Sequence, residues 1–182
     1  MKIEKTFIDG LFIIQPDIFT DDRGYFYESF SAKRFVELGI SETFVQDNFS
    51  RSVKNTIRGL HYQIGEYAQG KLCSVISGRV IDVAVDIRFG SPTFGKHVAV
   101  ELSDENKLQF WMPPGFAHGF AVLSDYAVFH YKCTAYFSRN YERTILYNDP
   151  VLKINWRIKN PIVSEKDKEA LSFDDIGKDF IY

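Results

Sequence analysis

The segment Val80-Ile81-Asp82-Val83-Ala84-Val85-Asp86-Ile87-Arg88 decides the fold class of this chain, because isoleucine or valine recurs at every second position from 81 to 87. A period of two places these side chains on one face of a β-strand and the intervening residues on the other face. Directly before this segment, Lys71–Ile76 is predicted to form a partner strand. Ser77-Gly78 is then predicted to be the two-residue turn of a hairpin between the two strands.

Similar alternation continues through most of the chain. It predicts further strands at 11–15, 43–49, 56–63, 97–102, 107–112, 117–123, 127–134 and 143–147. Helices are expected only at Ser31–Leu38 and at Ser164–Leu171. Many short strands at this spacing predict an all-β fold, most simply a double-stranded jelly roll with few short peripheral helices. We expect one domain over residues 1–182.

The composition excludes several classes of protein. Hydrophobic residues make up 45% of the chain and aromatic residues 16%, which is too apolar for a disordered chain. A net charge of −2 argues against binding of nucleic acid, and no apolar run is long enough to span a membrane. The chain begins without a signal-peptide pattern, and Cys73 and Cys133 are its only cysteines. Two thiols in a chain of this size are typical of a reduced, cytoplasmic protein, with one disulfide between them as the second option.

Two motifs each place a histidine on a predicted strand: Arg58-Gly59-Leu60-His61-Tyr62-Gln63 and Pro113-Pro114-Gly115-Phe116-Ala117-His118. The second motif fits the Pro-x-Gly-x-x-His pattern of the cupin superfamily, which makes the predicted jelly roll cupin-like. Metal-binding cupins carry a His-x-His pair in the first motif, where this chain has Gln63 in place of the second histidine. A transition-metal site usually needs three or four ligands. We therefore expect no metal.

A pair of histidines without a metal suits proton transfer, because a neutral imidazole with a pKa of about 6.5 can accept and return a proton. A base that removes an acidified C–H proton needs an orienting carboxylate, a cation near the developing enolate, and an acid on the opposite face. The candidates for these parts are Asp167, Lys71 and Tyr131. Each has a structural alternative: Asp167 could cap a helix, Lys71 could lie in solvent, and Tyr131 could pack in the core.

A second set of residues suits binding of phosphate groups and a planar ring. It comprises four cations, two amides at even spacing on one predicted strand, and three aromatic residues: Arg23, Arg58, Lys71 and Lys166; Gln46 and Asn48; Phe26, Trp111 and Tyr136. The alternative for scattered cations is a solvated surface. The chain has no glycine-rich phosphate loop and no Rossmann pattern, so side chains would have to hold a bound nucleotide.

Nine segments in this order resemble the dTDP-4-dehydrorhamnose 3,5-epimerase family over about residues 8–170. They are Asp22–Glu28, Gln46–Ser50, Arg58–Gln63, Gln69–Leu72, Asp82–Arg88, Gly115–Phe120, Tyr131-Lys132, Asn148-Asp149-Pro150 and Ser164–Asp167. The resemblance implies a jelly-roll homodimer of rhamnose biosynthesis that acts on dTDP-4-dehydro-6-deoxy-D-glucose. It also implies that the reaction needs no metal and no organic cofactor.

The resemblance further implies a role for individual residues. His61 would be the base, oriented by Asp167, while Lys71 would steady the enolate oxygen and Tyr131 would be the acid on the other face. The remaining substrate-binding candidates are Arg23, Phe26, Glu28, Gln46, Asn48, Arg58, His118, Tyr136, Glu142 and Lys166. Of these, Arg23, Phe26 and Glu28 would reach across from the neighbouring subunit, by exchange of a strand near the N-terminus.

Three alternatives stay open at this point. The first is epimerisation at C3 or C5 alone on a related dTDP-4-keto-6-deoxy sugar, although the presence of both His61 and Tyr131 favours the double reaction. The second is a jelly roll that binds a sugar nucleotide without catalysis, which predicts loss of one of these two residues. The third is a metal-dependent cupin enzyme, which would lose its activity when a chelator is added.

Overall fold

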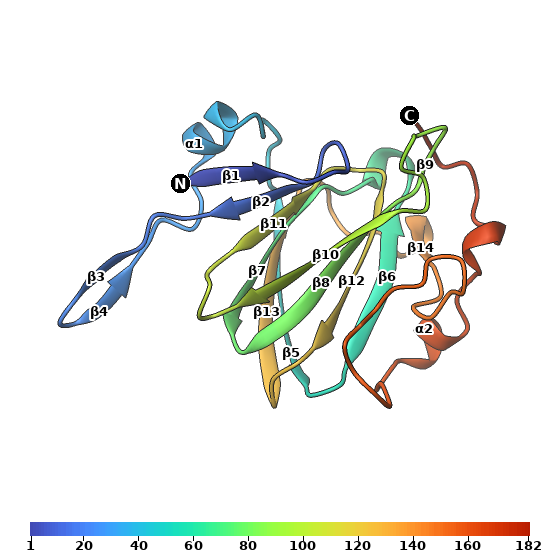
Figure 1. The fold of residues 1–182 in the computed structure, drawn as a ribbon. Coiled ribbons are helices and arrows are strands. Elements are labelled where there is room, and N and C mark those ends of the chain that lie inside the picture. The colour runs from blue at the N-terminus through green and yellow to red at the C-terminus, as the bar shows by residue number, and fades with distance from the viewer.

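The computed structural model describes residues 1–182 and consists mainly of two antiparallel β-sheets packed face to face (Figure 1). The six-stranded sheet contains, in spatial order, β1 (Lys2–Lys5), β2 (Phe12–Gln15), β11 (Gln109–Met112), β7 (Lys71–Ser77), β13 (Tyr126–Cys133) and β5 (Gln46–Val53). The five-stranded sheet contains β10 (His97–Ser103), β8 (Arg79–Asp86), β12 (Phe116–Val122), β6 (Ile57–Gln63) and β14 (Glu142–Thr144). This arrangement confirms the predicted all-β, jelly-roll class.

The remaining elements are short. β3 (Phe19–Asp21) pairs with β4 (Gly24–Phe26), and β9 (Arg88–Phe89) pairs in parallel with β15 (Phe180–Ile181). The two α-helices are α1 (Ala32–Glu37) and α2 (Glu165–Lys168), and three 3₁₀ turns lie at Gly65–Tyr67, Arg139–Tyr141 and Phe173–Asp175. Neither α-helix has the length and apolar character needed to cross a bilayer.

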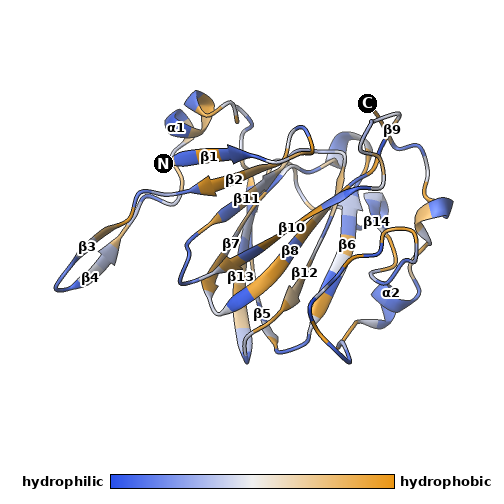
Figure 2. Ribbon diagram, viewed as in Figure 1, coloured by the Kyte–Doolittle hydropathy of each residue, from blue (hydrophilic) through white to orange (hydrophobic).

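Two hydrophobic clusters cover the two faces of the five-stranded sheet. Between the sheets, Phe120 of β12 stacks on Phe129 of β13 with ring centroids 4.2 Å apart. On the outer face, Ile81 and Val83 of β8 belong to a second cluster with Trp156 of the C-terminal segment. Both faces of β8 are therefore buried, and the even-numbered positions of this strand face the interior between the sheets. Figure 2 shows the hydrophobic residues concentrated along β8 and β12.

The predicted hairpin between β7 and β8 is wrong. β7 pairs with β11 and β13, whereas β8 pairs with β10 and β12 in the other sheet. Ser77-Gly78 therefore connects the two sheets and does not close a ladder. Gly78 has φ +84°, and a Cβ atom there would lie 2.2 Å from the Tyr126 carbonyl oxygen, so this turn requires glycine.

Most predicted strands exist with shifted ends. β5 starts at residue 46 and not at 43, β14 ends at 144 and not at 147, and α2 covers four residues of the predicted segment Ser164–Leu171. The short strands β1, β3, β4, β9 and β15 were not predicted. Cys73 and Cys133 are free thiols, so the disulfide alternative is wrong.

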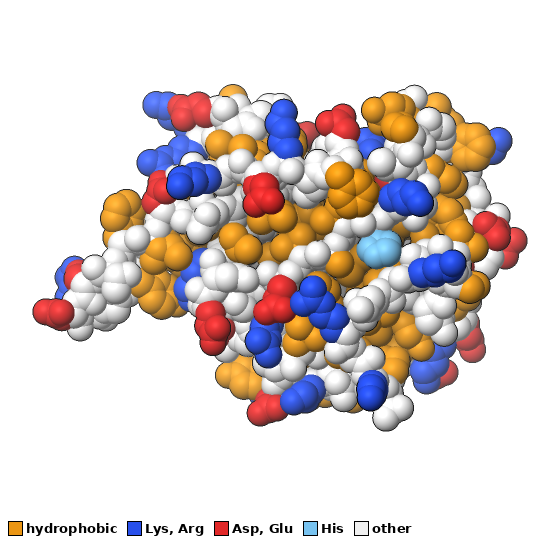
Figure 3. Space-filling view, in the orientation of Figure 1, with side chains coloured by type: hydrophobic (Ala, Val, Ile, Leu, Met, Phe, Trp, Pro, Cys, Tyr) orange, Lys and Arg blue, Asp and Glu red, His pale blue; other side chains and the backbone are white.

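The hairpin of β3 and β4 extends away from the two sheets as an arm (Figure 1). In Figure 3, charged side chains gather at the tip of this arm and hydrophobic ones at its base. The aromatic rings of Phe19, Tyr25 and Phe26 are more than half exposed. An arm that exposes this much aromatic surface is typical of a segment that contacts another molecule.

Candidate active site

Polar side chains replace hydrophobic ones at one end of the space between the two sheets. There they line a cavity of about 290 Å³, whose walls are Asn48, Phe49, Ser50, Arg58, His61, Lys71, His118, Phe120 and Tyr131. The two motif histidines lie side by side, because His61 of β6 is the register partner of His118 of β12. Six residues proposed from the sequence, namely Asn48, Arg58, His61, Lys71, His118 and Tyr131, therefore meet in one place.

His61 and Asp167 form a hydrogen-bonded pair, with 2.7 Å between His61 Nε2 and Asp167 Oδ1. The other carboxylate oxygen, Oδ2, accepts from the Gly59 amide at 3.3 Å. Burial raises the pKa of Asp167, but the hydrogen bonds from His61 and Gly59 outweigh burial and hold that pKa below its usual value. Because an ionised carboxylate can only accept, Nε2 of His61 is the donor, and in the neutral imidazole the lone pair is then on Nδ1. This arrangement suits a general base.

The alternative role of Asp167, as the cap of a helix, is wrong. The side chain that caps α2 is that of Ser164, which accepts a hydrogen bond from the Asp167 amide at 3.2 Å. The carboxylate of Asp167 does not take part in capping. It is 2% exposed and bonds to β6 instead, in a position from which it can orient the His61 imidazole.

Close approach of β6 and β12 holds the histidine strand in place. Gly59 has φ +126°, and a Cβ atom there would lie 2.5 Å from Gly119 Cα. Only glycine fits at this crossing, which explains its place between Arg58 and Leu60 in the motif.

Lys71 at the start of β7 is 7% exposed, so the solvated-surface alternative is wrong. Its Nζ lies 3.4 Å from the His61 carbonyl oxygen and 5.9 Å from the centroid of the Tyr131 ring. No carboxylate forms an ion pair with this ammonium group. A buried ammonium without an anionic partner is costly in isolation, and it can stabilise negative charge that develops in the cavity.

Tyr131 approaches the cavity from the other sheet, since β13 belongs to the six-stranded sheet and β6 to the five-stranded sheet. It packs against the core cluster but also lines the cavity, so it is both a packed residue and an accessible acid. Burial raises the pKa of Tyr131 to about 12. The phenol is therefore protonated at neutral pH and can donate a proton.

His118 has a carboxylate partner that the sequence reasoning missed. Its Nε2 lies 2.7 Å from Asp82 Oδ1, and both side chains are buried. Burial lowers the pKa of His118 and outweighs the opposing effect of Asp82, so this imidazole is neutral. The available signal was a carboxylate on the strand Val80–Arg88, whose hydrophobic alternation marks it as central and buried.

A second cleft of about 510 Å³ shares Arg58 and His61 with the first. Lys166 and Asp167 also line this cleft. Arg58 Nε donates to Ser52 Oγ at 3.0 Å, and the Lys166 ammonium pairs with Glu142 at 2.8 Å. Two cations beside His61 suit a ligand with phosphate groups.

Gln46 and Asn48 point inward from β5 and contact each other, with Gln46 Nε2 donating to Asn48 Oδ1 at 3.0 Å. Gln46 Oε1 also accepts from the Phe137 amide at 2.9 Å. Tyr136 and Phe137 lie on the loop after β13, and their side chains are 64% and 54% exposed. Tyr136 was proposed from the sequence and Phe137 was not, although the two form an adjacent aromatic pair before a polar turn.

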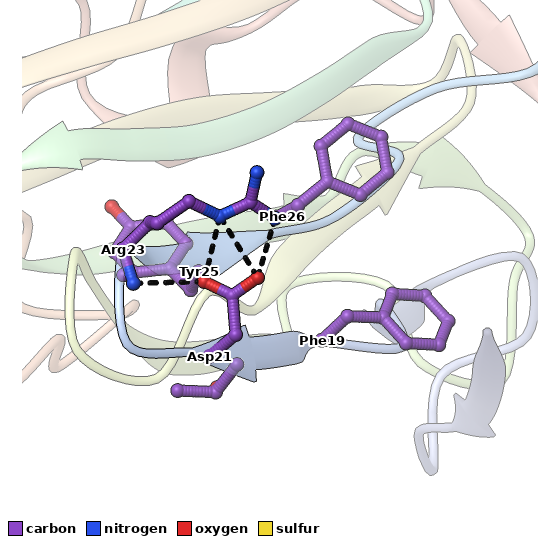
Figure 4. Close-up of a pocket in the computed structure, with 7 residues that line it drawn as sticks. Phe19, Asp21, Arg23, Tyr25 and Phe26 are labelled. Atoms are coloured by element: carbon purple, nitrogen blue, oxygen red, sulfur yellow. Dashed lines mark hydrogen bonds and ion pairs between the residues drawn. The ribbon is translucent and has the colours of Figure 1, made fainter.

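Three proposed residues belong to the arm or to the segment directly after it, and none of these three lines the cavity of its own chain. Arg23 and Phe26 are on the arm, where Arg23 pairs with Asp21 (Figure 4). Glu28 follows the arm and lies 3.4 Å from Arg34 of α1. The suggestion that Trp111 stacks on a ligand is wrong, because this side chain is 2% exposed and packs edge-on against Phe44 in a core cluster.

The cavity thus combines a base on one sheet, an acid on the other and a cation beside both. This set can remove a proton from a carbon next to a carbonyl and return a proton from the opposite face.

Comparison with known proteins identifies relatives over nearly the whole chain. The model of a family described as dTDP-4-dehydrorhamnose 3,5-epimerase matches residues 5–175. A dTDP-4-dehydrorhamnose 3,5-epimerase from Shigella flexneri is 52% identical over 96% of this chain and 97% of its own. The crystal structure of a dTDP-6-deoxy-D-glucose-3,5-epimerase from Legionella pneumophila, in complex with dTDP-4-keto-L-rhamnose, is 55% identical. It covers 100% of this chain and 98% of that one, with a TM-score of 0.95. A 3'-monoepimerase from Streptomyces bikiniensis, in complex with dTDP-quinovose, is similar at 29% identity and a TM-score of 0.87, over 93% of this chain and 86% of that one.

Proposed function

The chain belongs to the dTDP-4-dehydrorhamnose 3,5-epimerase family, and from this premise we propose how its own residues carry out the reaction. The enzyme is an isomerase that converts dTDP-4-dehydro-6-deoxy-D-glucose to dTDP-4-dehydro-L-rhamnose by inverting C3 and C5 of the sugar. The observation that supports the residue roles best is that His61 of one sheet pairs with Asp167 of α2, while Lys71 Nζ lies near both His61 and the Tyr131 ring of the other sheet.

Proton removal begins at Nδ1 of His61. The C4 ketone of the substrate withdraws electrons and makes the hydrogens at C3 and C5 acidic. When Nδ1 takes one of these protons, the C–H electron pair forms the enolate double bond and the ketone oxygen becomes negative. The adjacent carboxylate of Asp167 stabilises the resulting imidazolium.

The Lys71 ammonium is placed to stabilise the enolate oxygen, since it is buried and has no carboxylate partner. Tyr131 then gives its phenolic proton to the same carbon from the opposite face, and the carbon is inverted. Proton exchange with solvent resets both groups. Because the ketone lies between C3 and C5, one base and one acid can treat both carbons in turn.

Substrate recognition uses the residues around this centre. In this proposal Arg58 and Lys166 bind the diphosphate, and the ion pair with Glu142 holds Lys166 in position. The nucleobase would form hydrogen bonds with the amides of Gln46 and Asn48 and stack on the exposed ring of Tyr136. The neutral His118 would form a hydrogen bond with a sugar hydroxyl in the cavity.

The function is tested by proton NMR of dTDP-4-dehydro-6-deoxyglucose with the enzyme in deuterated water. We expect deuterium at both C3 and C5 and formation of the L-rhamno product. Deuterium at one carbon alone would favour a mono-epimerase, and deuterium at neither would favour a binding protein. Loss of activity with a chelator would favour a metal-dependent enzyme.

We extend the proposal to a homodimer in which each arm completes the site of the partner. The exposed aromatic rings of the arm and the position of Arg23 outside the cavity of its own chain support this arrangement. The free thiols support a reducing compartment, the cytoplasm.

The arm exchange predicts complementation between two inactive variants. In a mixed dimer of Arg23→Ala and His61→Ala chains, one site has both native residues and the other has neither. Random mixing of the two chains is therefore expected to restore about a quarter of wild-type turnover, as counted from the two-fold symmetry. The two variants are co-expressed and assayed by NMR, with each variant alone as control. A mixture no more active than its components would show that Arg23 acts within its own chain.

A further inference from the structure

Three glutamine side chains hold the backbone of the loop at residues 135–138, which we name the clamped loop. Gln69 Nε2 donates to the Ala135 carbonyl at 2.8 Å. Gln63 Nε2 donates to the Tyr136 carbonyl at 3.0 Å, and Gln63 Oε1 accepts from the Ser138 amide at 2.6 Å. Gln46 Oε1 accepts from the Phe137 amide at 2.9 Å. Every residue of the clamped loop is thus fixed through its backbone by an amide side chain.

This rigid backbone contrasts with the side chains it carries. Tyr136 and Phe137 are more than half exposed, and neither ring is needed to fill the core. Exposed aromatic side chains on a loop with a fixed backbone lose little further freedom when a planar ring stacks on them. The arrangement is that of a preorganised stacking surface.

Gln63 is the central member of the clamp. It is 4% exposed, and its amide group also donates to the Tyr67 carbonyl at 2.8 Å, so all of its hydrogen bonds go to backbone atoms. It stands two residues after His61 on β6, on the same face of the strand. This is the position at which the sequence pattern of metal-binding cupins has a second histidine. The strand that carries the base therefore also carries the clamp.

We propose that Gln63 is a positioning residue for the nucleobase, which holds the clamped loop so that its aromatic rings meet the base while the sugar lies at His61. This inference rests on the proposed function, because it takes the ligand to be a nucleoside diphosphate sugar. Base stacking on aromatic side chains contributes about 1–3 kcal/mol per base, which is roughly a 5- to 150-fold effect on affinity.

The test measures the dissociation constants of dTDP and of inorganic pyrophosphate by calorimetry. Gln63→Leu keeps the approximate size of the side chain but makes none of its hydrogen bonds. We expect dTDP to bind about 10-fold more weakly to this variant and pyrophosphate to bind unchanged, because pyrophosphate has no base to stack. Gln69→Leu, which removes one bond to the same loop, should have a smaller effect in the same direction.

A double-mutant cycle separates positioning from general destabilisation. In a chain that carries both Tyr136→Ala and Phe137→Ala, Gln63→Leu should cause no further loss of dTDP affinity. Asn106→Leu is the matched control, because Asn106 also makes three hydrogen bonds to backbone atoms, in the turn between β10 and β11. It should lower the melting temperature without changing dTDP affinity.

Two results would overturn the inference: unchanged dTDP affinity in Gln63→Leu, or an equal loss of affinity with and without the aromatic rings. An equal loss of pyrophosphate affinity would also overturn it, because the effect would then not concern the base. If the wild-type protein bound pyrophosphate but not dTDP, the proposed function would fail, and this outcome is distinct from the other three.

Discussion

Replacement of His61 by alanine is expected to abolish solvent exchange at both C3 and C5 of the substrate. Two histidines with a carboxylate partner line the cavity, but the His61 side chain is 28% exposed and the His118 side chain only 7%, so His61 is the one open to a substrate. General base catalysis typically contributes about 10²- to 10⁴-fold, and we expect a loss at the upper end of this range at both carbons. Proton NMR in deuterated water measures both exchange rates, and calorimetry with dTDP should show unchanged binding.

Two further variants make this result specific. His97→Ala removes a histidine from β10 of the same sheet, outside the cavity, and should leave exchange unchanged. Asp167→Asn keeps the imidazole but removes the charge that stabilises the imidazolium, so its rates should lie between those of wild type and His61→Ala. Exchange at one carbon that persists in His61→Ala would show that a second base serves that carbon.

The strand content of this fold was predictable from local patterns, whereas the pairing of strands was not. Alternation in Val80–Arg88 indicates a strand in any context, because it depends only on the backbone period. The assumption that β7 pairs with β8 failed because a short turn can either close a hairpin or cross from one sheet to the other. Which of the two occurs depends on the residues that pack against the outer face of β8. These include Trp156, which is far from β8 in the sequence.

The site was predictable as a set of residue types but not as a geometry. Nothing local to Asp167 distinguishes a helix cap from a partner of His61, since the two residues are 106 positions apart in the sequence. Asp82 was not proposed because its importance comes from its contact with His118, which is 36 positions away in the sequence but on the adjacent strand of the sheet. Trp111 was misjudged for the opposite reason: an aromatic residue that could stack on a ligand satisfies the core equally well.

Replacement of Tyr131 by phenylalanine is expected to reduce inversion far more than exchange. The base on the other sheet remains intact, so the enolate still forms. The imidazolium then exchanges the proton that it took for a deuteron from solvent, and this deuteron can return to the face from which the proton left. The expected product is substrate that has gained deuterium but kept its configuration. Inversion should fall by roughly 10²- to 10⁴-fold. The ratio of exchange to product formation, measured by NMR in one sample, reports this separation.

The ionisation of Tyr131 gives an independent check, since burial raises its pKa to about 12. The protonated phenol is the active acid, so inversion should be lost only as the pH rises toward that pKa, and the tyrosine should not limit the rate between about pH 7 and pH 9. Tyr126→Phe, at the exposed start of the same strand, is the matched control and should change neither exchange nor inversion. If exchange and inversion fell equally in Tyr131→Phe, the phenol would be needed to form the enolate, and the assignment of separate base and acid would be wrong.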